Sequence, residues 1–342
     1  MNHNSLKFLF LFTLLSGMFI TISSNSWLSA WMGLEINLLS FIPLMSNSNN
    51  IFTTEAALKY FLIQALASSI LLFIVISKSL IESIFTIINP SITSIMISTP
   101  LLMKSGAAPL HWWFPSVMEG LSWNNCFILM TIQKISPLML ISYMINFNSF
   151  MTFIIILSVM IGAIGGYNQT SIRKILTYSS INHMGWMLTA MLMGENMWIL
   201  YFTIYSFLTL TIIMIIHPFQ ISFINQTHLI NNDNKIMKFL LFSSLLSLGG
   251  LPPFLGFLPK WMIIQFMVMN WSMIVITLMV VFSLITLYYY LRISYSAFIM
   301  LNNEPSWSYY LNNENSKILI LSLPLTSISI LGLISTAFIN IF

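Results

Sequence analysis

The sequence predicts an all-α, polytopic membrane helix bundle with about eleven transmembrane helices. Of its 342 residues, 58% are hydrophobic and only 6% are charged, whereas a soluble domain carries about 25% charged residues. The apolar runs, such as 151–162 and 273–287, are long and apolar on every side. They fit helices of about 20 residues and not the alternating strands of a barrel. Lipid must therefore be the solvent for most of the surface.

The chain reads as one membrane domain, 1–342, broken only by short polar connectors such as Asn225–Lys235 and Asn302–Lys317. The first span is expected to be retained, because its flanks lack the features of a signal or transit peptide. Breaks at polar or turn-rich clusters delimit the candidate spans. They cover 6–23, 27–45, 56–77, 92–117, 126–145, 149–167, 174–194, 197–220, 237–268, 272–299 and 317–340.

Basic residues gather at one end of these spans. With this span order, the N-terminal side of the membrane holds Lys7, Lys59, Arg173, Lys174, Lys235, Lys238, Arg292 and Lys317. The opposite side holds Lys78 alone. Positive residues favour the matrix or cytoplasmic side. We therefore expect the N-terminus on that side and the C-terminus across the membrane.

Two spans contain helix-breaking residues near a lysine. Pro100, Gly106 and Pro109 surround Lys104, and Gly249-Gly250, Pro252-Pro253, Gly256 and Pro259 precede Lys260. An unbroken helix over 237–268 would run about 46 Å, well beyond the roughly 30 Å core. We therefore expect both spans to be interrupted inside the membrane.

The two interrupted spans lie five helices apart, which indicates an internal repeat. A repeat of five helices must invert its topology, and paired broken helices are typical of such inverted repeats in transporters. The predicted repeats are 1–145 and 149–299, followed by a C-terminal helix at 317–340.

Four charged residues fall where a bilayer is least tolerant of charge. Glu35, Lys104 and Lys134 lie near the midpoints of their spans, and Lys260 lies beside the second break. A charge at the bilayer centre costs at least about 2.5–3.5 kcal/mol, so such residues usually face a polar interior. Structural ion pairs remain one interpretation. Proton transfer is the other, because burial favours a neutral amine while a nearby carboxylate favours the ammonium.

Other site types find little support. His183 lies in mid-span and fits either a proton relay or a hydrogen-bonded packing histidine. No span carries two buried histidines, and Cys126 is the single cysteine, which argues against haem, copper, zinc or a disulfide framework. Glu55 and Lys59 are spaced for an ordinary i, i+4 salt bridge. The net charge of +4 is too small and dispersed for nucleic acid.

Several stretches, in order along nearly the whole chain, resemble the mitochondrial NADH dehydrogenase (ubiquinone) subunit 2 family, one of the antiporter-like subunits of respiratory complex I. These stretches are 54–61 (TEAALKYF), 104–113 (KSGAAPLHWW), 133–137 (QKISP), 178–186 (YSSINHMGW) and 249–261 (GGLPPFLGFLPKW). Glu35 falls on the family's membrane glutamate, and Lys134 on its central lysine. Lys104 and Lys260 fall on the lysines of the two broken helices.

The resemblance implies a proton-translocating subunit of NADH:ubiquinone reductase in the mitochondrial inner membrane. The N-terminus would face the matrix and the C-terminus the intermembrane space. Flavin, iron–sulfur clusters and ubiquinone would be bound by other subunits, so this chain would hold no cofactor. Its partners would be other membrane-arm and supernumerary subunits, lipids such as cardiolipin, protons and internal water, without nucleic acid. Animal members lack three N-terminal helices of bacterial relatives, which agrees with about eleven spans.

Two alternatives stay open at this point. A stand-alone cation/proton antiporter would use the same buried lysines without redox partners. A purely structural membrane subunit would use them only to pair helices.

Overall fold

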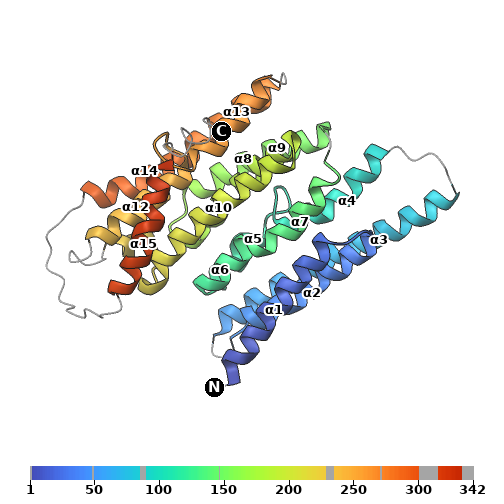
Figure 1. The fold of residues 1–342 in the computed structure, drawn as a ribbon, viewed down its shortest axis with the longest axis horizontal. Helices are drawn as coiled ribbons and strands as arrows, with labels where there is room; N and C mark the ends of the chain where they lie inside the picture. The colour runs from blue at the N-terminus through green and yellow to red at the C-terminus, as the bar shows by residue number, and fades with distance from the viewer. Residues whose placement is uncertain are drawn as a thin grey trace. The chain divides into compact units, whose positions relative to one another are not determined.

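A computed structural model of the chain describes residues 2–47, 50–84, 90–145, 147–228, 235–269, 272–299 and 315–332 (Figure 1). The chain divides into two compact units, Met1–Ser158 and Val159–Phe342. The helices of the first unit are α1 (Asn2–Ile22), α2 (Trp27–Met45), α3 (Ile51–Ile84), α4 (Pro90–Ser105), α5 (Trp113–Gly120), α6 (Trp123–Met130) and α7 (Ile132–Ser142). The division falls within α8 (Ser149–Tyr167).

The second unit continues with a longer series of helices. These are α9 (Ile172–Met193), α10 (Glu195–Ile216), the short 3-10 helix η1 (His217–Phe219), α11 (Ile224–His228), α12 (Lys235–Gly249), α13 (Phe257–Met269), α14 (Met273–Ile299) and α15 (Asn315–Ile330). The predicted C-terminal helix is described from 315 to 332, and the rest of its range lies outside the described residues.

Seven stretches among the described residues are helical, long and apolar enough to cross a bilayer. They are 5–23, 27–45, 51–80, 123–142, 149–167, 195–219 and 273–295. The prediction of an all-α protein with many membrane spans is confirmed. The predicted spans 27–45 and 149–167 coincide with α2 and α8.

Glycines allow close helix packing in the first unit, where α1 lies along α2 (Figure 1). A Cβ added at Gly17 would lie 3.0 Å from the backbone nitrogen of Asn37, and one at Gly33 would lie 2.9 Å from that of Thr21. Small residues allow backbones to approach in this way in membrane bundles, where packing replaces the hydrophobic effect between helices. The helix that carries Glu35 is thus held closely against its neighbour.

Two of the predicted spans differ clearly from the observed helices. Helix α3 runs from Ile51 to Ile84, beyond the predicted 56–77, because polar residues end an apolar run without ending a helix. The span predicted at 126–145 is divided at Thr131 into α6 and α7. At the division, the Phe127 carbonyl accepts from both the Thr131 amide at 3.0 Å and the Thr131 hydroxyl at 2.7 Å. The Lys134 amide bonds three residues back, to the Thr131 carbonyl, at 3.0 Å.

Helix α9 forms the core of the second unit. Most of its residues between Ile172 and Met191 are buried, including serines, threonines and an asparagine. It packs against α10, α13 and α14, and α12 packs against α10, α14 and α15. An isolated antiparallel bridge between Ser171 and Phe223, which the sequence did not indicate, ties the start of α9 to the segment before α11. Polar side chains of α9 therefore face protein rather than lipid.

Candidate functional site

The first predicted break is present between α4 and α5. Helix α4 ends at Ser105, and Gly106 follows with a φ of +76°, a backbone conformation that favours glycine. The amides of Gly106 and Ala107 both donate to the Leu102 carbonyl at 3.1 Å, which closes the helix end. The chain then resumes as a helix at Trp113.

Side chains from other parts of the first unit satisfy the carbonyls exposed by this break. The Trp113 indole N–H donates to the Met103 carbonyl at 3.1 Å, and the Gln64 amide donates to the Lys104 carbonyl at 3.3 Å. The final carbonyls of a helix have no partner within it and need such donors when buried. The break is therefore a built feature of the interior.

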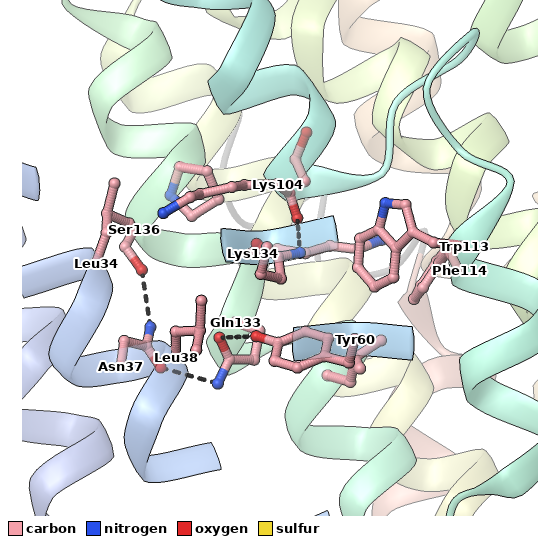
Figure 2. Close-up of a pocket in the computed structure, with 14 residues that line it drawn as sticks. Leu34, Asn37, Leu38, Tyr60, Lys104, Trp113, Phe114, Gln133, Lys134 and Ser136 are labelled. Atoms are coloured by element: carbon pink, nitrogen blue, oxygen red, sulfur yellow. Dashed lines mark hydrogen bonds between the residues drawn. The ribbon is translucent and has the colours of Figure 1, made fainter. Parts of the chain in front are cut away.

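Lys104 and Lys134 line the same internal cavity of about 20 Å³ (Figure 2). This volume is room for about one water molecule. Lys104 is 8% exposed and occupies the last turn of α4, where the helix dipole is negative and favours a cation. Lys134 is 2% exposed and enters from α7. The sequence placed both lysines at mid-depth, and the structure brings them to one site.

The Lys134 ammonium lies over an aromatic ring. Its Nζ is 4.9 Å from the centroid of Phe114, which is the geometry of a cation–π contact. In Figure 2 the Lys134 side chain extends toward Trp113 and Phe114 on α5. The lysine of α7 therefore reaches the helix that follows the first break.

A ladder of polar side chains crosses one side of this cavity, and we call it the amide ladder: Tyr60, Gln133, Asn37 and Ser136. The Tyr60 hydroxyl donates to Gln133 Oε1 at 3.2 Å. Gln133 Nε2 donates to Asn37 Oδ1 at 2.8 Å, and Asn37 Nδ2 donates to Ser136 Oγ at 3.2 Å (Figure 2). The ladder joins α3, α7 and α2, and so connects the helix of Glu35 with the helix of Lys134.

Glu35 lies on α2, half-buried, and acts electrostatically on Lys104. Both side chains are described, and no ion pair within 4.0 Å joins them. A carboxylate near but not bonded to a buried ammonium leaves room for a water or a small movement between the two. By contrast, Glu55 and Lys59 form the predicted i, i+4 ion pair at 2.6 Å on the exposed side of α3.

The second predicted break lies between α12 and α13, and its local geometry parallels the first. Gly250 follows the end of α12 with a φ of +83°, and its amide donates to the Leu246 carbonyl at 3.2 Å. Lys260, 5% exposed, lies in the first turn of α13 and returns to the break, where Nζ donates to the Gly249 carbonyl at 3.0 Å. The ammonium of Lys260 therefore lies at the C-terminal, negative end of α12, although its backbone belongs to α13. Its Nζ is 5.9 Å from the ring of Trp186.

His183 is 6% exposed on α9, in the interior of the second unit. Its Nδ1 lies 2.8 Å from the Tyr201 hydroxyl, and its ring centroid is 5.1 Å from that of Tyr205. The structure therefore places this histidine among phenols of α10. A hydroxyl at hydrogen-bond distance is compatible with both interpretations that the sequence left open.

The sequence prediction overlooked the neutral polar residues that complete the first site. Asn37, Gln64 and Gln133 are amides within apolar spans, and that position was an available signal because an unpaired amide in lipid is costly. Within the part of the chain that the structure describes, no group of three or more histidine, cysteine, aspartate or glutamate side chains is arranged to hold a metal.

Comparisons with known proteins agree with this architecture. The family model described as "NADH:quinone oxidoreductase/Mrp antiporter, TM" matches residues 24–286, and the model described as "NADH dehydrogenase subunit 2 C-terminus" matches 287–340. The chain is 53% identical over 334 residues to NADH-ubiquinone oxidoreductase chain 2 of Anopheles gambiae, with 97% of each chain covered. It is 48% identical over 340 residues to the same-named protein of Locusta migratoria, with 98% of each covered.

A solved structure gives the same result for the fold. A chain of respiratory complex I from Thermus thermophilus, solved with bound aureothin, superposes with a TM-score of 0.81 at 22% identity. The match covers 95% of this chain and 78% of that one. The family models and the close relatives together show that the chain belongs to the NADH-ubiquinone oxidoreductase chain 2 family of antiporter-like membrane subunits.

Proposed function

We propose that the chain is a proton-translocating core membrane subunit of respiratory complex I, the NADH:ubiquinone oxidoreductase. The observation that carries the proposal is the pair of buried lysines, Lys104 and Lys134, in one polar cavity within an otherwise apolar helix bundle. Ionisable residues inside a membrane are expensive and mark ion or proton pathways. Membership of the family supports the same function.

The proposed path begins at Glu35 and Lys104, continues through Lys134 and ends at Lys260, with His183 as a further member. Moving one proton outward costs about 2.3 kcal/mol per 100 mV of membrane potential. We propose that redox chemistry in other subunits supplies this energy, and that flavin, iron–sulfur clusters and ubiquinone are bound there. Partner subunits of the membrane arm and lipids such as cardiolipin would surround the chain.

The proposed topology has eleven spans, with inverted repeats at 1–145 and 149–299 and a C-terminal helix at 317–340. Its support is the parallel between the two breaks. Each follows a half-helix that ends at a glycine of positive φ, Gly106 or Gly250, and each has a buried lysine at the negative end of that half-helix. The balance of basic residues places the N-terminus in the matrix and the C-terminus in the intermembrane space of mitochondria.

The test is Lys104→Met in the assembled complex reconstituted into vesicles. Methionine retains the length of the side chain without its charge, so protons pumped per NADH oxidised should fall while the complex still assembles. Lys7→Met, an exposed lysine of α1, is the matched control and should pump normally. Unchanged stoichiometry in assembled Lys104→Met would contradict the relay and favour a structural role for the lysines.

A second candidate function is a stand-alone cation/proton antiporter, because the matching family model includes Mrp antiporters. This function requires no redox partner. The purified chain in vesicles would then exchange protons for sodium or potassium ions under an imposed gradient. The complex I proposal expects no such exchange from the chain alone.

A further inference from the structure

The interior of the second unit contains polar atoms that no protein group satisfies. Among the described residues, the side-chain oxygen of Asn182 and the indole nitrogen of Trp186 have no hydrogen-bond partner, and the buried hydroxyls of Tyr289 and Tyr290 face only each other and Ser179. Tyr289 is 0% exposed and Tyr290 is 1% exposed. Buried polar groups are almost always bonded to protein or to ordered water. The orphaned atoms of Asn182 and Trp186 therefore indicate internal water.

Asn182 of α9 lies close to the two phenols of α14. The Asn182 amide donates to the Thr286 hydroxyl at 3.3 Å, and Thr286 precedes Tyr290 by one helical turn. The rings of Tyr289 and Tyr290 contact each other with centroids 4.7 Å apart. Tyr290 also lies beside Ser179 of α9. The Asn182 side chain and the two phenols therefore belong to one polar cluster between α9 and α14.

The cluster reaches both proton-bearing residues proposed for this unit. A Cβ added at Gly249 would lie 3.4 Å from the Tyr290 ring, and the carbonyl of Gly249 is the acceptor for Lys260 Nζ at 3.0 Å. On the other side, Tyr205 is electrostatically coupled to Tyr290 and packs against His183 at 5.1 Å. The Tyr290 ring thus lies near the residue whose carbonyl binds Lys260, and the Tyr205 ring lies against His183.

We propose that Tyr290 and Tyr205, with the water that Tyr289 and Asn182 hold, pass protons between Lys260 and His183. This inference rests on the proposed function, because it assumes that Lys260 carries a translocated proton. The ammonium of Lys260 gives one proton to water, and each hydroxyl then accepts a proton and releases its own. Lys260 ends as an amine and His183 as an imidazolium, so the hydroxyls and water are unchanged.

The test compares substitutions of two tyrosines that lie two residues apart on α14. Tyr290→Phe removes only the buried hydroxyl and retains the ring against Gly249. Tyr288→Phe is the matched control, since Tyr288 is 50% exposed and stacks on Tyr167 at 5.7 Å. In the reconstituted complex, Tyr290→Phe should lower the proton-coupled rate about two- to tenfold, the effect of losing one hydrogen bond from the relay. It should also increase the rate difference between H₂O and D₂O, and a merely structural hydroxyl would not.

Tyr290→Phe that behaves like Tyr288→Phe would overturn the inference. Lys260→Met distinguishes failure of the phenol relay from failure of the proposed function. Normal pumping by Lys260→Met would contradict the proposed function and the phenol relay together. Lost pumping by Lys260→Met, with normal pumping by Tyr290→Phe, would contradict only the phenol relay. Should Tyr290→Phe fail to assemble, Tyr289→Phe takes the same measurements. A density map of the whole complex should show water within hydrogen-bond distance of either hydroxyl, and a dry cluster would overturn the proposal.

Discussion

Replacing Asn37 with leucine should destabilise the first unit, because Asn37 holds the middle of the amide ladder. Its side chain accepts from Gln133 at 2.8 Å and donates to Ser136 at 3.2 Å. Leucine has a similar branched shape, although it is larger, and makes neither bond. The substitution therefore leaves a buried donor and a buried hydroxyl without their partner.

The size of the effect follows from the number of bonds and their surroundings. Side-chain hydrogen bonds between membrane helices average about 0.6 kcal/mol each, and leaving a buried polar group unsatisfied costs about 1–3 kcal/mol. The adjacent cavity has room for about one water, which can replace part of the loss. We therefore expect a cost of about 1–2 kcal/mol, toward the lower end of these estimates.

A double substitution provides the sharper measurement. In Asn37→Leu with Gln133→Leu, neither amide remains to be orphaned by the other, so the double variant should lose less stability than the two single variants added together. The loss of the double variant should be smaller than that sum by at least about 0.5 kcal/mol, because the effects of independent sites add to within about that amount. Thermal inactivation of the purified complex gives the ranking, with the exposed Asn196→Leu as control. Simple additivity would refute the ladder as a coupled unit.

Two further changes have expectations of different size. Gly256→Ala should impair assembly severely, because its Cβ would collide with the Ser247 carbonyl. Gly106→Ala should cost only about 1–2 kcal/mol of backbone strain, since the nearest atom to its Cβ is 3.5 Å away. The amount of this subunit in the membrane measures both effects, and equal losses would contradict the comparison. Tyr201→Phe should lower thermal stability by about 0.5–1.5 kcal/mol through loss of the His183 contact, and an unchanged thermal midpoint would show that this contact contributes nothing.

The fold class and the two breaks could be predicted because they depend on composition and on backbone chemistry. Long apolar runs require helices in lipid, and the clusters of proline and glycine beside Lys104 and Lys260 favour interruptions there. The division at Thr131 could not be predicted in this way, because no proline or glycine lies at that position and Pro137 stands inside α7 without ending it. Proline inside a membrane helix is tolerated when neighbouring groups satisfy the freed carbonyls. Whether they do so is a property of tertiary packing.

The candidate site, too, could be predicted from the sequence only in part. Sequence position identified Lys104 and Lys134 as buried charges, but their common cavity depends on how α4 packs on α7, which no local pattern encodes. The phenols near His183 were also overlooked, because tyrosines are ordinary in an apolar helix and only the fold separates Tyr290 from the exposed Tyr288. Charged residues in lipid are conspicuous, while neutral hydroxyls and amides become informative only when their partners are known.

The two broken helices suggest why lysine suits both sites. Lys104 lies in the C-terminal turn of the half-helix before its break, and the ammonium of Lys260 returns to the Gly249 carbonyl at the C-terminal end of the half-helix before the other break. That end carries a partial negative charge and, because the helix stops, carbonyls that accept hydrogen bonds. Such a site stabilises a buried ammonium with dipoles rather than with a full counter-charge. An ion pair would hold the proton more tightly, whereas a dipolar site leaves the lysine sensitive to the approach of a single charge such as Glu35.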